Sequence, residues 1–415
     1  MGVTYNREQE LAIERMISHA EEKGTEPFLL LEGPAGSGKT TCLREMLQQV
    51  PGRGVVMTAP TNKAVKVIEE AVPDAYATTI YKLLGLHLMA DGEFKRVAGM
   101  NSLQDLEGIK LVVIDEGSML GRKLTEYIDA VAEYNPKVRW IVMGDRWQLP
   151  PVRESISPIW GFENRIELKT VMRTDNQILA MSEHVRSLIV GKGVLTIKDN
   201  YDERGGVYVP RDFQKSILED VEAFRTGESK AIAWRNVAVD LLNKAIRQEL
   251  LGTEARHAWC VGERITLLEP AMSEDGIVTL ASTDEEGIIE YISEGRNPIL
   301  RGFKCWHLNI ETSDGRKVKL WTLHESDRIK YDKQVLSLAE KAREDHKLWR
   351  HFWIFKEAFH NIRHAYATTA HRSQGSTHTR TYVNWRDILA NRKRSEAMRC
   401  LYVAVSRPKQ KLFMG

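Results

Sequence analysis

The sequence is poor in cysteine and has no long hydrophobic run. Its four cysteines, Cys42, Cys260, Cys305 and Cys400, are scattered along 415 residues and form no Cys-x-x-Cys pair. We therefore expect neither a disulfide framework nor a cysteine zinc site, and a reducing compartment is the simplest one. No segment approaches the roughly 18 consecutive apolar residues of a membrane-spanning helix. The first residues lack the basic head and apolar stretch of a secretion signal, so we expect a cytoplasmic protein.

The chain also lacks a strong net charge, an internal repeat of fixed period and a low-complexity tract. A net charge of +2 is too small to identify a partner. Its distribution is uneven, because residues 361–415 hold eleven Lys or Arg against only Asp387 and Glu396. A segregated basic segment suits a polyanion such as a nucleic-acid backbone, and a solvated basic surface is the alternative.

The chain exceeds the usual size of one hydrophobic core, so we expect about two to four domains. Its first 150 residues alternate short apolar segments with longer periodic ones. The apolar segments predict buried strands at Phe28–Leu31, Val55–Thr58, Leu111–Ile114 and Trp140–Met143. Strands that alternate with helices in this way are typical of a parallel sheet in an α/β domain.

A second α/β pattern follows in the remaining sequence. It predicts strands at Ala231–Trp234, Arg380–Val383 and Leu412–Met414, with helices near Val237–Leu251 and Asn391–Val405. Asp-Gly and Glu-Gly turns interrupt β-rich runs between Glu263 and Leu323, which predicts a small antiparallel barrel inserted into this second domain. A charged helical stretch follows at about Ser326–Phe359. In the first domain, Asp91-Gly92 predicts a hairpin within Leu86–Val97.

A phosphate-binding loop is the clearest chemical signal. Gly33–Thr40 fits the pattern G-x-x-x-x-G-K-[ST] and lies between a predicted strand and a helical segment. Gly36 and Gly38 let backbone N–H groups turn inward around phosphates at the positive end of that helix. Lys39 would reach the β- and γ-phosphates, and Thr40 would hold Mg²⁺ through its hydroxyl.

Two carboxylates complement this loop. Asp115 and Glu116 follow a predicted central strand, so they lie at the end of the sheet that carries the loop. Asp115 suits an anchor for Mg²⁺, and Glu116 is placed to orient or deprotonate an attacking water. Gln148, on the loop Gly144–Val152, could touch the γ-phosphate. Phosphoryl transfer also needs positive charge on the transferred group, for which Arg173 and Arg407 are candidates.

Taken together, these segments resemble the ordered motifs of superfamily 1 helicases. The likeness is to the phage Dda and RecD branch, with Pif1-type helicases as relatives, and it covers nearly the whole chain. The matching segments are Asn6–Ile13 with Gln9, Gly33–Thr40, Thr58–Ala64, Thr78–Leu83, Asp115–Met119, Gly144–Val152, Ala367–Ser376 and Tyr402–Arg407.

The resemblance implies an α/β fold with two RecA-like P-loop NTPase domains, an inserted β-hairpin and an inserted SH3-like barrel. Residues 1–175 would form domain 1A, with the hairpin pin at about 84–108. Residues 176–262 and 360–415 would form domain 2A. Residues 263–359 would form domain 2B, the SH3-like barrel with its helical extension.

The resemblance also implies roles for individual residues. Gln9 would read the adenine edge, and Arg407 would be the arginine finger of the second domain. Contact with or sensing of the γ-phosphate is implied for Gln148, Arg173, Gln374, Gly375 and Arg407. The nucleotide would be bound by Gly33, Pro34, Ala35, Gly36, Ser37, Gly38, Lys39, Thr40 and Thr41. The strand-binding groove would be lined by Pro60, Thr61, Asn62, Lys63, Thr79, Asn236, Thr369, His371 and Ser373.

Two aromatic residues keep alternative interpretations. Relatives usually have His where this chain has Tyr81, and the Tyr81 ring could stack on a base or simply pack. Phe94 follows the Asp91-Gly92 turn, and in this branch a hairpin pin supported by the barrel splits the duplex. Phe94 could meet the duplex junction or pack the hairpin onto the domain below.

The function implied is an ATP-dependent DNA helicase that uses ATP and Mg²⁺ and travels 5′ to 3′. Its partners would be single-stranded and fork DNA, with a single-stranded-DNA-binding protein or replisome component, in the cytosol of a bacterium or a phage-infected host. A translocase that remodels protein–DNA complexes with little unwinding and an RNA-acting helicase are the alternatives. Other classes are a nucleotide-gated switch, a small-molecule kinase and a pure DNA-binding module. Stimulation of ATP hydrolysis by single-stranded DNA would distinguish a helicase or translocase from all three.

Overall fold

The chain forms two compact units. A computed structural model describes residues 4–21, 26–50, 54–88, 94–96, 103–171, 177–191, 193–272 and 279–415. Unit 1 comprises Met1–Phe213, Ile232–Arg235 and Thr369–Gly415, and unit 2 comprises Gln214–Ala231 and Asn236–Thr368. Among the residues described, no helix combines the length and the apolar character that crossing a membrane requires.

Unit 1 contains a six-stranded sheet in which neighbouring strands are all parallel. Its order is β3 (Tyr76–Thr79), β2 (Val55–Ala59), β6 (Leu111–Ile114), β7 (Arg139–Gly144), β1 (Phe28–Glu32) and β8 (Arg165–Glu167). The four strands predicted from apolar segments are confirmed. The two edge strands, β3 and β8, are additional.

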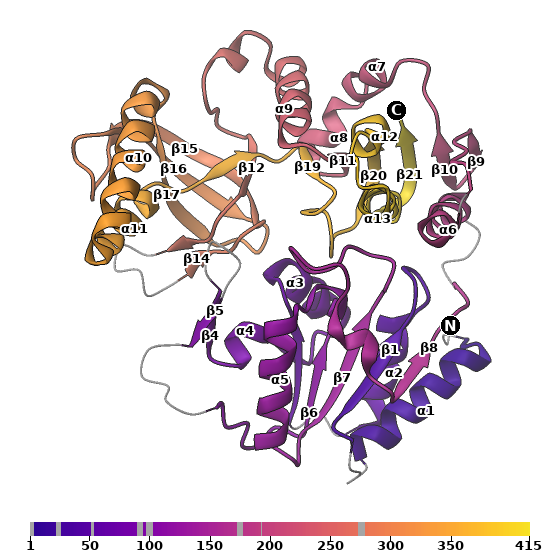
Figure 1. The fold of residues 1–415 in the computed structure, drawn as a ribbon. Coiled ribbons are helices and arrows are strands. Elements are labelled where there is room, and N and C mark those ends of the chain that lie inside the picture. The colour runs from indigo at the N-terminus through magenta and orange to yellow at the C-terminus, as the bar shows by residue number, and fades with distance from the viewer. Residues whose placement is uncertain are drawn as a thin grey trace. The chain divides into compact units, whose positions relative to one another are not determined.

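Successive residues of the central strands pack on opposite faces of this sheet, as the two-residue period of a strand requires. Leu29 and Leu31 join one apolar core, and Leu30 joins another on the opposite face. One core is shared with helices α1 (Arg7–Glu21), α2 (Lys39–Gln49) and α3 (Asn62–Ala71). The other is shared with α4 (Ile80–Leu83), α5 (Arg122–Tyr134) and η2 (Pro158–Gly161). Figure 1 shows helices α1 to α5 around the strands of the first sheet.

The strands of the predicted hairpin are present. β4 (Leu86–Leu88) and β5 (Phe94–Arg96) pair antiparallel, with Leu88 opposite Phe94. The Asp91-Gly92 turn lies outside the residues that the structure describes.

The second sheet also has six strands and an α/β surrounding. Its order is β19 (Ala367–Thr369), β11 (Ser229–Ala233), β20 (His378–Val383), β21 (Pro408–Met414), β10 (Gly205–Tyr208) and β9 (Asn200–Asp202). β10, β21 and β20 are parallel, and β9 pairs antiparallel at the edge. In unit 1, residues of this sheet share an apolar core with α6 (Gln177–Val190), α12 (Trp385–Leu389) and α13 (Arg394–Val405). Helix α7 (Phe213–Leu218) begins where unit 1 gives way to unit 2.

Unit 2 is dominated by a five-stranded antiparallel sheet. The order is β17 (Lys317–Leu323), β16 (Lys304–Thr312), β15 (Glu286–Arg296), β12 (Arg264–Leu267) and β18 (Ile362–His364). A separate pair is formed by β13 (Ala271–Met272) and β14 (Thr279–Ala281). The predicted antiparallel strands are confirmed, and their closure into an SH3-like barrel stays a prediction.

Helices complete unit 2. The predicted charged stretch forms α10 (Arg328–Glu344) and α11 (Trp349–Glu357), which pack aromatic side chains with Phe303 of the adjoining loop. Helices α8 (Val221–Thr226) and α9 (Asn236–Leu251) accompany β11. Short 3₁₀ turns of unit 2 lie at η3 (Gly252–Arg256), η4 (Glu325–Asp327) and η5 (His346–Leu348), and η1 (Gly117–Met119) lies in unit 1.

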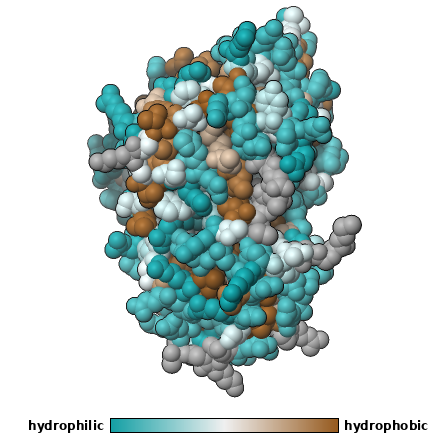
Figure 2. Space-filling model, turned by 90° about the vertical axis from the view of Figure 1, so that its right-hand side faces the viewer, coloured by the Kyte–Doolittle hydropathy of each residue, from teal (hydrophilic) through white to brown (hydrophobic). Residues whose placement is uncertain are grey.

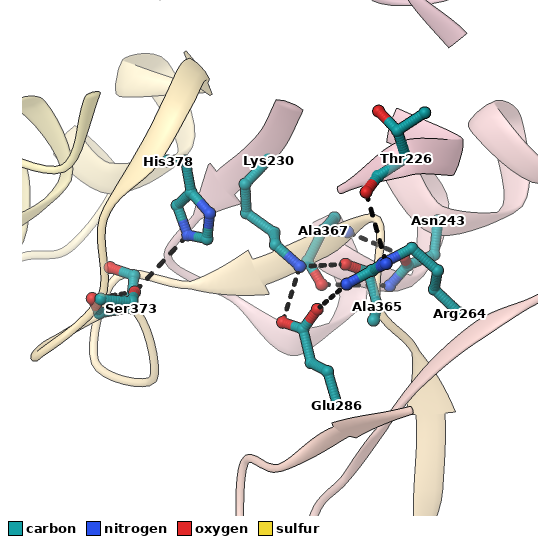
Figure 3. Close-up of polar contacts among 10 residues, drawn as sticks. Thr226, Lys230, Asn243, Arg264, Glu286, Ala365, Ala367, Ser373 and His378 are labelled. Atoms are coloured by element: carbon teal, nitrogen blue, oxygen red, sulfur yellow. Dashed lines mark hydrogen bonds and ion pairs between the residues drawn. The ribbon is translucent and has the colours of Figure 1, made fainter. Parts of the chain in front are cut away.

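A buried ionic cluster fixes the base of the antiparallel sheet within unit 2. The Lys230 ammonium of β11 is 2.8 Å from Glu286 of β15 and also donates to the Ala365 carbonyl. Arg264 of β12 approaches the same carboxylate at 3.3 Å (Figure 3). Lys230 is buried and Arg264 is half-buried, so the Glu286 carboxylate that faces both cations offsets the cost of burying their charges.

Some large apolar side chains of the described residues are exposed. Figure 2 shows one face of the molecule, on which hydrophobic side chains lie in narrow patches among hydrophilic ones. Val190 and Val194 are among the exposed apolar residues of the described chain, at 73% and 81% exposure. Scattered residues of this kind are ordinary on protein surfaces and require no partner.

Candidate nucleotide and nucleic-acid site

The loop Gly33–Thr40 joins β1 to α2 and takes its shape from glycine. Gly36 and Gly38 have φ of +83° and +89°, in the left-handed region that other residues rarely adopt. At Gly38 a side chain is also excluded by space, because a Cβ there would lie 2.4 Å from Gln9 Nε2. Helix α2 begins at Lys39 with no side-chain cap, so its first N–H groups face the loop.

Gln9 is fixed against this loop. Its backbone N–H donates to Asn6 Oδ1 and its side-chain Oε1 accepts from the Asn6 N–H, a reciprocal cap at the start of α1. The remaining amide Nε2 donates to the Ser37 carbonyl at 3.1 Å. Gln9 is 3% exposed, so it supports one wall of the loop.

Lys39 lies over the same loop. Its ammonium donates to the carbonyls of Gly33 at 2.7 Å and Pro34 at 3.1 Å. Among the residues described, the buried Ser37 hydroxyl has no hydrogen-bond partner. A positive charge, an unsatisfied buried hydroxyl and the start of a helix therefore surround one loop, which suits a polyphosphate.

Asp115 and Glu116 stand at the end of β6, where the sequence places them. The Asp115 carboxylate accepts the Glu116 N–H at 2.8 Å. Glu116 adopts φ of +52°, a conformation that costs on the order of 1–3 kcal/mol in a non-glycine residue. Gly117 follows and packs so closely on β7 that a Cβ would lie 2.6 Å from Val142. The chain is thus turned sharply directly after the two carboxylates.

Burial alters the protonation of both acids. It raises the pKa of Asp115, while the Glu116 N–H and Lys39 act in the opposite direction. Burial and then repulsion from Asp115 raise the pKa of Glu116 to about 7, against the charges of Arg407 and Lys39. A carboxylate in this range is suited to exchange a proton near neutral pH.

The residues present fit a divalent cation held with the help of phosphates. The described residues contain no cluster of three or more His, Cys, Asp or Glu able to hold a metal ion by themselves. Mg²⁺ is commonly bound through one or two carboxylates together with substrate phosphates. Asp115 and the Thr40 hydroxyl are the donors that this chain would offer.

Gln148 and Gln374 bring two distant segments together in unit 1. Gln374 Nε2 donates to Gln148 Oε1 at 3.1 Å, across 226 positions of sequence. The same amide nitrogen lies 3.4 Å from the Ser118 hydroxyl, two residues after Glu116. Both glutamines are buried. The segment after β19 therefore contacts two segments that follow strands β6 and β7 of the first sheet.

Arg407 is buried at the end of α13. Its guanidinium donates to Val403 O at 2.9 Å, Ser376 O at 3.2 Å and Ser406 Oγ at 2.8 Å. Its charge is close enough to Glu116 to oppose the rise in the pKa of that acid. The other candidate, Arg173, lies outside the described residues.

Comparison with known proteins agrees with this geometry. Residues 4–209 match the AAA domain family, and residues 364–414 match the UvrD-like helicase C-terminal domain. The ATP-dependent DNA helicase dda of Enterobacteria phage T4 is 26% identical, over 92% of this chain and 93% of its own length. The chain is an ATP-dependent DNA helicase of superfamily 1, related to phage T4 Dda and to Pif1.

Solved structures share the fold of this helicase. One of them is a Pif1 structure that addresses DNA unwinding at forked dsDNA by two coordinating Pif1 helicases, and its TM-score is 0.55. It is 16% identical, and the match covers 99% of this chain and 92% of that chain. The Bacteroides Pif1 helicase in complex with ADP-AlF3 and ssDNA has a TM-score of 0.53, with 15% identity and the same coverage. At these identities the likeness concerns the fold alone.

Several predicted groove residues of the helicase have structural roles as well. Thr61 and Thr79 are N-caps, and their side chains accept from the N–H groups of Ala64 and Lys82. Pro60 is buried, whereas Asn62 is exposed. A Cβ on Gly375, whose φ is +72°, would lie 3.6 Å from Ala64 Cβ. The Gly375 turn therefore lies beside the start of α3, which carries Asn62 and Lys63.

The segment after β19 contributes an exposed and a buried part. His371 is exposed and lies 3.9 Å from Glu396. Thr369 Oγ1 accepts the Arg372 N–H, and the fully buried Ser373 hydroxyl donates to Ala370 O. Ser373 thus shapes the turn, and direct contact with DNA stays a prediction.

One predicted groove residue belongs to unit 2. Asn236, the first residue of α9, is exposed and its Oδ1 accepts from Arg363 at 3.0 Å.

The two ambiguous aromatic residues contact each other. The Phe94 ring lies 6.2 Å from Tyr81 and 6.1 Å from Tyr127 of α5, at aromatic-pair distances. Phe94 and Tyr81 are half-buried against the apolar core of the first sheet. In this arrangement the packing interpretation accounts for both rings, and the role of Phe94 at a duplex junction stays a prediction.

The sequence alone missed a group of buried and half-buried polar residues beside the loop. Asp145 accepts hydrogen bonds from Ala35 and Tyr402, and Arg399 donates to the carbonyls of Arg146 and Gln148. Asp145 and Tyr402 do lie in segments that match helicase motifs. Nothing in the local sequence indicates that they meet.

Proposed function

We propose that this helicase hydrolyses ATP to move 5′ to 3′ along single-stranded DNA and to separate the strands of a duplex ahead of it. The observation that carries the motor in this proposal is the contact between Gln148 and Gln374, and the direction of travel is taken from the resemblance to the Dda and RecD branch. A nucleotide switch or a small-molecule kinase needs the phosphate loop but has no need of a second, distant segment at the hydrolysis residues. A motor needs this second segment, because nucleotide state must be converted into movement.

The domain organisation proposed for this motor keeps the boundaries expected from the sequence, although β18 (Ile362–His364) of the antiparallel sheet lies outside the proposed domain 2B. Domain 1A is residues 1–175, with a hairpin pin at about 84–108 that includes β4 and β5. Domain 2A is residues 176–262 and 360–415. Domain 2B is residues 263–359, with an SH3-like barrel and helices α10 and α11.

In the proposed hydrolysis site, each residue has a separate task. Thr40 and Asp115 would hold Mg²⁺, which supplies positive charge to the phosphate oxygens when bound. Glu116 orients the attacking water and accepts its proton, for which a pKa of about 7 is well suited. Lys39 and an arginine, Arg407 or Arg173, neutralise the charge that develops on the transferred phosphoryl group.

Movement follows from contacts made by both segments with the same γ-phosphate. Lys39 and Gln148 follow strands β1 and β7 of the first sheet, whereas Gln374 follows β19 of the second sheet and Arg407 follows helix α13. A γ-phosphate contacted from both sides favours one arrangement of the segments, and its loss removes that preference. Groove residues that hold the strand in one state and release it in the other would convert the change into steps.

Related proteins support DNA as the track. The phage T4 relative is a DNA helicase, one Pif1 structure is a complex with ssDNA, and another concerns DNA unwinding at forked dsDNA. The basic segment 361–415 suits a phosphate backbone. A single-stranded-DNA-binding protein or a replisome component is the proposed protein partner.

The direction of travel is tested with tailed duplexes. We expect ATP-dependent strand separation of a DNA duplex with a 5′ single-stranded tail and none above background with a 3′ tail. Matched RNA tails should give little unwinding. Preference for the 3′ tail would contradict the direction, equal activity on RNA would favour an RNA-acting helicase, and DNA-stimulated ATP hydrolysis without strand separation would favour a translocase.

Phe94→Ala tests the pin. If Phe94 meets the duplex junction, the variant should lose about tenfold in unwinding rate and keep its single-stranded-DNA-stimulated ATPase within about twofold. Tyr127→Leu is the matched control, because Tyr127 contacts Phe94 from α5 and lies outside the hairpin. Equal loss in both variants, or equal loss of ATPase and unwinding, would show that Phe94 only packs the hairpin.

A further inference from the structure

A buried hydrogen-bonded group joins the phosphate loop to helix α13 in unit 1. Asp145 is 1% exposed and its Oδ2 accepts from the Ala35 N–H of the loop at 3.0 Å. The same oxygen accepts from the Tyr402 hydroxyl of α13 at 2.7 Å. The Ala35 N–H also lies 3.2 Å from the Tyr402 oxygen, so the loop N–H, the carboxylate and the phenol are each within hydrogen-bond distance of the other two. Asp145 Oδ1 accepts the Trp147 N–H at 3.0 Å, which satisfies the other side of the carboxylate.

The protonation states favour this arrangement. Burial, followed by the adjacent Asp145, raises the pKa of Tyr402 well above its usual value. The phenol therefore keeps its proton and donates it to the carboxylate. A hydrogen bond from a neutral donor to a buried carboxylate is stronger than a neutral pair, and its loss leaves the carboxylate less well satisfied.

Helix α13 holds the loop after β7 at a second point. One turn before Tyr402, Arg399 donates to the carbonyls of Arg146 and of Gln148, the latter at 2.7 Å. Gln148 is itself the partner of Gln374. One face of α13 is therefore attached to the segment that runs from Asp145 to Gln148.

The same helix leads to the proposed arginine finger. Arg407 follows Tyr402 by five positions, and α13 ends at Val405. Since a helix transmits position rigidly over so short a distance, fixing the Tyr402 hydroxyl fixes the point from which Arg407 starts. The group thus connects Ala35, inside the nucleotide loop, with the residue proposed to stabilise the transition state.

We infer that Tyr402 is a positioning residue for ATP hydrolysis, whose hydroxyl sets the place of Arg407 relative to the phosphate loop through Asp145. This inference rests on the role of Arg407 in the proposed function. Tyr402 lies among buried residues and acts through its hydrogen bonds, with no contact to the phosphates required. Removing its hydroxyl should therefore lower the rate of ATP hydrolysis more than the affinity for ATP.

Tyr402→Phe removes the hydroxyl and keeps the ring. We expect the kcat of ATP hydrolysis to fall about tenfold, the effect of losing one hydrogen bond to a charged group, with KM for ATP within about twofold of wild type. Tyr382→Phe is the matched control, since Tyr382 is equally buried in unit 1 but packs on Phe413 in the second sheet. This control should keep its kcat.

A second measurement separates positioning from a purely structural role. In an Arg407→Ala background, measured by single turnover at high enzyme concentration, Tyr402→Phe should have little further effect, because the residue through which it acts is absent. The same fractional loss in both backgrounds, or a kcat equal to that of Tyr382→Phe, would overturn the inference. All rates are measured with and without single-stranded DNA. A wild type that does not respond to DNA would contradict the proposed function, while the DNA-free rates would still decide the role of Tyr402.

Discussion

Replacing Lys39 with alanine is expected to reduce the ATPase of this helicase in the presence of single-stranded DNA by about a thousandfold or more. The Lys39 ammonium lies within hydrogen-bond distance of the Gly33 and Pro34 carbonyls, over the loop that would hold the phosphates. Its removal takes away a charge that no neighbour in the loop replaces. Steady-state phosphate release in the presence and absence of DNA measures the effect.

The binding of single-stranded DNA should survive this substitution. Lys39 belongs to the nucleotide loop, and the predicted groove residues belong to other segments. Lys137→Ala, at an exposed lysine in the turn before β7, is the control for loss of one positive charge and should hydrolyse ATP normally. A Lys39→Ala variant with wild-type ATPase would remove the basis for placing the nucleotide at this loop.

The first sheet could be predicted from sequence because its central strands are continuous apolar runs. Leu29, Leu30 and Leu31 supply both faces of β1, a pattern that a strand buried on both sides requires. The edge strand β8 was missed because Arg165 and Glu167 surround a single apolar residue. Edge strands need less apolar sequence, so periodicity identifies them poorly.

The second sheet was predicted incompletely for a different reason. Strand β10 begins with Gly205 and Gly206, which sequence rules associate with turns. Both have positive φ, and a Cβ on Gly205 would lie 2.0 Å from Gln410 O of the neighbouring strand. Close approach of two backbones therefore demands glycine here, and this requirement exists only in the folded chain.

In the candidate site, too, the contiguous residues could be predicted from the sequence, and the contacts between distant residues could not. The phosphate loop is contiguous, so its residues and spacing predict its geometry. The contact between Asp145 and Tyr402 spans 257 positions, and neither residue type at its position specifies the other. The capping roles of Thr61 and Thr79 could be identified only once the structure showed where helices α3 and α4 begin.

Arg407→Ala is expected to lower the kcat of ATP hydrolysis by about a thousandfold while ATP affinity changes by less than about fivefold. An arginine that acts mainly on the charge developing in the transition state contributes little to ground-state binding. Equilibrium binding of a fluorescent ATP analogue, together with single-turnover hydrolysis, measures the two quantities separately.

Burial of Arg407 makes a structural role the competing explanation, because its guanidinium also joins Ser376 O and Val403 O. Arg407→Lys keeps the charge and cannot make the same set of contacts. If the contacts matter only for stability, both variants should unfold at lower temperature and lose ATP binding in parallel with turnover. Arg392→Ala, at an exposed arginine just before α13, should behave as wild type. Normal turnover in Arg407→Ala would instead show that another arginine supplies the catalytic charge, and Arg173 is the next candidate. The negative charge on the transferred phosphoryl group still requires a positive side chain near it.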